Sequence, residues 1–139
     1  MSASFTVRNN AAERTIYVRM TGAFDETAMQ AFATDYKRAT DEYRGGAHLV
    51  LADMRGMKPT SPDAATVLGE AIGYARGRGV ACCAHLSDST IQRLQARRVA
   101  RSSSPGDDVT IDVASEDEAK RVLAEQREDL VRRSSRPPK

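Results

Sequence analysis

The stretch His48-Leu-Val-Leu-Ala-Asp53 decides the fold. Its apolar run, Leu49-Val50-Leu51, is typical of a strand that is buried on both faces. Such strands lie in the middle of a sheet that helices cover on both sides. The sequence therefore predicts an α/β fold with this strand near its centre.

An exposed loop and a helix are predicted directly after this strand. Asp53 closes the strand, and Gly56 and Pro59 mark a turn. Ser61 is a natural N-cap, because its hydroxyl can accept a hydrogen bond from a free backbone amide, and Pro62 suits the first helical position. The helix then continues through apolar residues at helical spacing: Ala64, Val67, Leu68, Ala71, Ile72 and Ala75. We look for function at the loop and the helix start.

The chain before the central strand predicts a hairpin and a helix. Residues 4–8 and 15–21 alternate apolar and polar side chains, as half-buried strands do, and Asn9-Asn10 opens the turn between them. Asp25 is placed to cap a helix that runs to about Tyr43.

The chain after residue 79 predicts two more strands and two more helices. Residues 80–86 form a mostly apolar strand, and Ser87-Asp88 begins a third helix that runs to about Arg101. Residues 109–113 alternate as an edge strand. Ser115, with Glu118 three residues later, forms a capping box that opens a fourth helix.

These elements give the order ββαβαβαβα within one domain, residues 1–133. Right-handed crossovers would build a mainly parallel, mixed sheet of about five strands with four helices, and the hairpin would supply an antiparallel edge. Residues 134–139, Ser-Ser-Arg-Pro-Pro-Lys, are predicted to be a disordered tail.

Composition favours a soluble cytoplasmic domain. The chain has 139 residues, 40% of them hydrophobic, and a formal net charge of +2, so charge gives no strong case for nucleic acid or an anionic membrane. We expect no membrane span and no signal peptide. The adjacent Cys82 and Cys83 point to opposite faces of a strand, which predicts two reduced thiols and no metal site.

No catalytic motif stands out, and we expect neither an enzyme nor a bound cofactor. His48 and His85 lie in or near different strands, and each is interpreted as a structural or surface histidine. The sequence has no nucleophile elbow, Walker loop or dinucleotide fingerprint.

The order and lengths of these elements resemble the STAS domain family, whose founding members are bacterial anti-sigma factor antagonists. The resemblance covers about Phe5 to Leu130. It includes the strand 48–53 and the segment 60–69, where family members carry an Asp-Ser-Ser-Gly-like run. One serine of that run is phosphorylated by a partner kinase that is also an anti-sigma factor.

The resemblance implies a regulatory module in transcriptional signal transduction that docks on a protein partner through residues 54–66. Counting from the strand places the phosphorylated position on Ser61, whereas counting back from Leu68-Gly69 places it on Pro62. Ser61 as a plain N-cap is the alternative, and Thr60 is a second candidate for phosphorylation. The expected partner-binding residues are Asp53, Met54, Arg55, Met57, Lys58 and Val67.

Three other hypotheses remain open. A STAS-like protein could bind a small molecule or lipid in an apolar pocket between sheet and helices, and a pocket of several hundred Å³ would mark that function. The last strand's edge could pair in a homodimer. The third predicted helix carries Arg93, Arg97 and Arg101 at four-residue spacing, which is either a solvated face or a surface for an acidic protein; nucleic acid is unlikely without interleaved aromatic residues.

Overall fold

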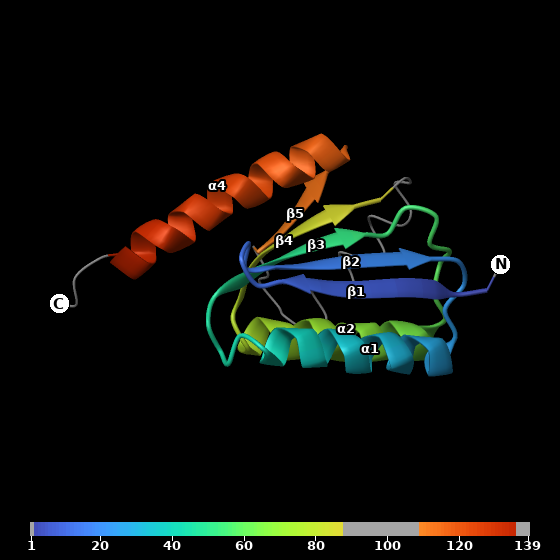
Figure 1. Cartoon of the computed structure of the whole chain (residues 1–139). Helices are drawn as coiled ribbons and strands as arrows, with labels where there is room; N and C mark the ends of the chain where they lie inside the picture. Colours follow the sequence, from blue (N-terminus) through green and yellow to red (C-terminus); the bar gives the residue numbers. More distant parts are fainter. Residues whose placement is uncertain (1, 88–108, 136–139) are drawn as a thin grey trace.

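The protein is a mixed α/β structure built on one five-stranded sheet (Figure 1). The computed structural model describes residues 2–87 and 109–135, with side chains to Arg132. In chain order the elements are β1 (Ser4–Asn10), β2 (Thr15–Thr21), α1 (Glu26–Asp41), β3 (His48–Asp53), α2 (Pro62–Gly77), β4 (Val80–Leu86), β5 (Thr110–Val113) and α4 (Glu116–Ser135).

The strands follow one another across the sheet in the order β1-β2-β3-β4-β5. β1 pairs antiparallel with β2, and every later pair is parallel. The predicted mixed sheet and the central place of β3 are therefore confirmed. β1 is longer than predicted, because Asn9 and Asn10 still pair with Ile16 and Thr15. The turn lies after them, where the Asn10 side chain accepts a hydrogen bond from the Glu13 amide at 3.1 Å.

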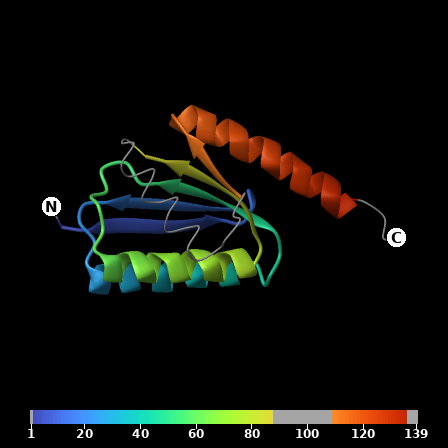
Figure 2. The same cartoon turned by 180° about the vertical axis from the view of Figure 1, so that it is seen from behind.

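Helices cover both faces of the sheet, as Figures 1 and 2 show. α1 and α2 lie side by side on one face, and α4 crosses the other. β3 contributes side chains to the hydrophobic core on each face of the sheet. Val50 belongs to the cluster that contains Phe32, whereas Leu49 and Leu51 belong to the cluster that contains Leu123. The prediction that this strand is buried on both faces is confirmed.

Local sequence signals fix where the helices begin. Asp25 caps α1 by accepting a hydrogen bond from the Ala28 amide at 2.8 Å, and Ser61 caps α2 in the same way. Gly79, with φ +113°, directly precedes β4, and a Cβ there would lie 2.4 Å from the Gly46 carbonyl oxygen. Only glycine lets β4 begin this close to the segment that leads into β3.

Three helices lie within the described residues, whereas the sequence predicts four. The predicted third helix, with Arg93, Arg97 and Arg101, lies outside the described residues. α4 continues to Ser135, two residues into the predicted tail, and residues 136–139 also lie outside. Among the described helices, none is both long enough and apolar enough to cross a membrane.

Candidate functional site: the loop between β3 and α2

The loop between Asp53 and Pro62 leaves the carboxyl end of the central strand and faces solvent (Figure 1). Arg55, Gly56, Lys58, Pro59 and Ser61 are exposed. Open α/β sheets commonly bind ligands and partners at this edge. The loop that the sequence predicts as a functional site thus has an exposed polar surface.

A bidentate ion pair between Arg55 and Asp53 stabilises the start of the loop. Arg55 donates from Nε to Asp53 Oδ1 at 3.0 Å and from Nη2 to Asp53 Oδ2 at 2.9 Å. Its backbone amide also donates to Oδ1, at 3.1 Å. Burial by itself would raise the pKa of Asp53, but these hydrogen bonds and the charges of Arg55 and Arg19 lower it. Asp53 is therefore an ionised carboxylate that fixes the loop.

Backbone hydrogen bonds hold the loop on two neighbouring strands. The Met54 amide donates to the Leu86 carbonyl at 2.8 Å, beside the end of β4. Gly22, directly after β2, donates to the Gly56 carbonyl at 3.0 Å and accepts from the Lys58 amide at 2.9 Å. The exposed side chains therefore project from a fixed backbone.

Met54 and Met57 do not provide the expected exposed apolar contact. Their side chains are only 9% and 7% exposed and belong to the core between the sheet and α1 and α2. Gly56, with φ +81°, turns the chain so that Met57 points inward. Val67 is partly buried against the same core. The prediction that Met54 and Met57 provide exposed apolar contacts is therefore wrong, and the exposed part of the loop is polar.

Ser61 lies exposed at the N-terminus of α2. Its Oγ accepts a hydrogen bond from the Ala64 amide at 3.2 Å, which confirms its role as N-cap. Thr60 is half-buried, and Asp63 is exposed in the first turn of the helix. The Ser61 hydroxyl is thus both a structural cap and accessible from solvent.

His48 is a structural residue, as the sequence indicates. It is fully buried and stacks on the Tyr43 ring with 4.2 Å between centroids. Its Nδ1 donates to the Gly46 carbonyl at 2.8 Å, and its Nε2 lies 2.5 Å from the Thr40 hydroxyl. Burial lowers the pKa of His48; the hydrogen bond to Gly46 opposes this effect and the charge of Arg14 adds to it, so that the imidazole is neutral near pH 7.

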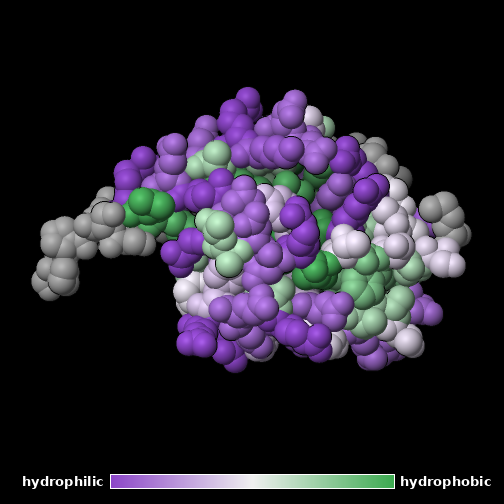
Figure 3. Space-filling model, in the orientation of Figure 1, coloured by the Kyte–Doolittle hydropathy of each residue, from purple (hydrophilic) through white to green (hydrophobic). Residues whose placement is uncertain are grey.

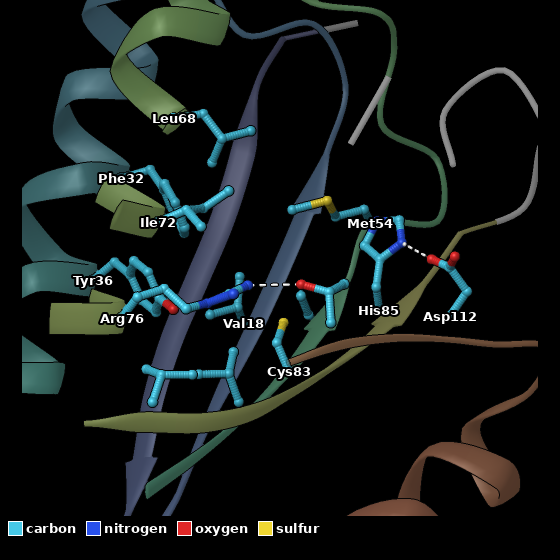
Figure 4. Close-up of a pocket in the computed structure, with 14 residues that line it drawn as sticks. Val18, Phe32, Tyr36, Met54, Leu68, Ile72, Arg76, Cys83, His85 and Asp112 are labelled. Carbon is cyan, nitrogen blue, oxygen red and sulfur yellow. Dashed lines mark hydrogen bonds and ion pairs between the residues drawn. The ribbon is translucent and has the colours of Figure 1, made fainter. Parts of the chain in front are cut away.

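A second group of polar side chains, which the sequence does not indicate, lines a small cavity between the sheet and the helices α1 and α2 (Figure 4). His85 Nδ1 lies 3.1 Å from Asp112 Oδ1, and Arg76 Nη2 donates to the Thr110 hydroxyl at 2.6 Å. The sequence assigns Asp112 only to the polar positions of an edge strand. The parallel register sets His85 directly opposite Asp112, a pairing that requires knowing that β4 and β5 are neighbours.

The cavity is small, and its lining combines these polar groups with apolar side chains. Its volume is about 60 Å³, and most of its lining is apolar. Figure 4 shows the His85 ring turned toward Asp112. Across residues 2–87 and 109–132, no group of three His, Cys, Asp or Glu side chains could hold a metal ion.

No family model matches this chain, and neither does any curated protein or solved structure.

Proposed function

We propose that this protein is a non-enzymatic regulatory module of the STAS type, which docks on a protein partner through the loop and helix start at residues 54–66. The observation that carries the proposal is the exposed polar loop, held by the Asp53–Arg55 pair, which leads to an accessible Ser61 at a helix N-terminus. A surface that is ordered before binding loses less conformational entropy on association.

The chemistry of the loop favours a polar partner surface. Arg55, Lys58 and Asp63 supply charge, and Ser61 supplies a hydroxyl. Phosphorylation of Ser61 would add roughly −1.5 to −2 charges to this surface. The helix N-terminus would stabilise the phosphate, while a partner that is acidic at this point would be repelled. Ser61 is therefore the favoured switch residue, and Thr60 is the second candidate.

Binding of a small molecule or lipid is the second candidate function, and the cavity in Figure 4 is the observation that bears on it. Its volume of about 60 Å³ is far below the several hundred Å³ of ordinary ligand pockets. The docking module is therefore better supported.

Site-specific photo-crosslinking tests the docking surface. A photoreactive amino acid replaces Lys58 in the loop or, as the control, the exposed Arg38 on α1, and each protein is irradiated in an extract of the source cells. We expect a discrete product from position 58 only, which Ser61→Asp reduces. The same products from both positions, or none from position 58, would contradict docking through the loop.

Mass spectrometry tests the switch separately. Protein isolated from the source cells is digested and searched for phosphate on Thr60 and Ser61. Phosphate on either residue would support regulation at the helix start, while crosslinking at position 58 that is insensitive to Ser61→Asp would remove Ser61 from that role.

A further inference from the structure

The face of the sheet that carries α4 has an open polar groove over β1 and β2. α4 packs against β3, β4 and β5. On the same face, Thr6, Arg8 and Arg19 are exposed. The groove between these strands and the first turns of α4 measures about 460 Å³. Hydrophilic side chains dominate the surface between α4 and β1 in Figure 3.

Three cations in this groove form no salt bridge with the described residues. Arg8 lies over the Tyr17 ring, with its guanidinium carbon 4.7 Å from the ring centroid. Arg19 stands opposite Asp53 in the sheet, and Lys120 projects from α4. Among the described residues, none of the three has a carboxylate oxygen within 4 Å. The Tyr17 ring also restricts the motion of Arg8, which lowers the entropy cost of binding a ligand there.

Two of the carboxylates that line the groove are already engaged. Asp53 is held by both prongs of Arg55. The Glu13 carboxylate accepts hydrogen bonds from the Tyr17 hydroxyl at 2.7 Å and from the side-chain amide of Asn10 at 2.8 Å. Glu116, in the first turn of α4, is the remaining acid of the lining. Among the described acids of the lining, only Asp53 is paired with a cation, so Arg8, Arg19 and Lys120 outnumber the two remaining acids, Glu13 and Glu116.

The two arginines have the spacing of alternate side chains on an extended chain. The register pairs Arg8 with Tyr17 and Thr6 with Arg19, so that Arg8 and Arg19 are diagonal neighbours on one face. Such neighbours lie about 7 Å apart. Side chains two residues apart on an extended peptide repeat at about the same distance. Two carboxylates on one side of an extended segment could therefore meet both guanidinium groups.

We infer that this groove binds an extended acidic segment of a partner protein, with carboxylates at alternate positions on Arg8 and Arg19. Lys120 adds attraction from the wall formed by α4. Nucleic acid fits less well, because the Tyr17 ring is already covered by Arg8 and does not offer a free face on which a base could stack. This surface is separate from Lys58 and Ser61, and the inference does not depend on docking through the loop.

Fluorescence anisotropy with labelled peptides tests the inference on the full chain. The probe is a short peptide with glutamate at alternate positions, and the matched peptide has glutamine in their place. The double variant Arg8→Gln/Arg19→Gln is compared with Arg38→Gln/Arg132→Gln, which removes the same charge from two exposed arginines elsewhere. Thermal unfolding followed by circular dichroism verifies that both variants are folded.

We expect the glutamate peptide to bind, binding to weaken as salt rises, and the groove variant to weaken it about tenfold, as expected for two exposed ion pairs. The control variant and Lys58→Glu should bind the peptide as the native protein does. Equal weakening by groove and control variants, equal binding of the glutamine peptide, or tighter binding of a single-stranded oligonucleotide of equal charge would overturn the inference.

Discussion

The Arg55 guanidinium group donates hydrogen bonds to both carboxylate oxygens of Asp53, at 3.0 and 2.9 Å. The backbone amide of Arg55 donates to the same carboxylate. The pair turns the end of the central strand into the base of the exposed loop. Because burial alone would raise the pKa of Asp53, its lowered pKa depends on Arg55 and, to a lesser extent, on Arg19.

We predict that Arg55→Gln raises the pKa of Asp53, whereas Arg19→Gln, which removes a charge but no hydrogen bond, raises it less. Carbon-detected NMR titration of the Asp53 carboxyl group measures both changes. Because the folded pKa lies below the unfolded value of 3.8, this carboxylate stabilises the native protein above that pH, and the stabilisation is lost as pH falls through the folded pKa. A larger shift from Arg19→Gln would contradict this account of the loop.

Ser61 combines a structural and a proposed regulatory role, and two substitutions separate them. Ser61→Ala removes the acceptor for the Ala64 amide and should lower the free energy of unfolding by ~1 kcal/mol. Ser61→Asp restores a capping oxygen and adds negative charge, so its stability should stay close to that of the native protein. Urea unfolding measures both, with the exposed Lys58→Ala as control. An Ala variant as stable as the control would remove the capping role.

Cys82 should be unreactive in the native protein. Its side chain is only 2% exposed, and burial raises the pKa of its thiol to about 11, so little of the reactive thiolate is present near neutral pH. We expect mass spectrometry after iodoacetamide treatment to find Cys82 unmodified in folded protein and modified in urea. Rapid modification without urea would mean that the core under α4 opens readily.

Much of the fold could be predicted because its signals are local. The apolar run of β3 and the caps at Asp25 and Ser61 depend on neighbouring residues alone. The burial of Met57 is not predicted, because the sequence of a polar loop does not show that Gly56 turns the next side chain back into the core. The pairing of His85 with Asp112, 27 residues later, depends on β4 and β5 being neighbours in the sheet, which the local sequence does not reveal. The sequence therefore predicts the position of the loop, but it predicts neither the burial of Met54 and Met57 nor the polar cavity.

Arg127 links α4 to the β1–β2 hairpin across the sheet. It donates from Nε to the Glu13 carbonyl at 2.7 Å and from Nη2 to the buried Thr15 hydroxyl at 3.1 Å. We predict that Arg127→Ala lowers the free energy of unfolding by about 1–2 kcal/mol, because these charge-assisted hydrogen bonds are lost. Urea unfolding should show a change within about 0.5 kcal/mol for the exposed control Arg132→Ala. Equal effects would mean that the link contributes no stability.

His48 should make the protein less stable in mild acid. Burial lowers its pKa in the folded state below the unfolded value of 6.5, so the unfolded chain takes up this proton first as pH falls. The contribution of His48 to the pH dependence is absent above that value. Between the unfolded and folded pKa values, stability falls by up to about 1.36 kcal/mol per pH unit.

Urea unfolding from about pH 8 to about pH 5 measures this slope. His48→Phe keeps an aromatic ring against Tyr43 but loses the hydrogen bonds to Thr40 and Gly46, so it should be less stable at neutral pH and depend less on pH below 6.5. His85 is retained in both proteins, so the difference between their slopes isolates His48. Equal slopes would mean that His48 is protonated in the folded protein as readily as in the unfolded chain, which its burial argues against.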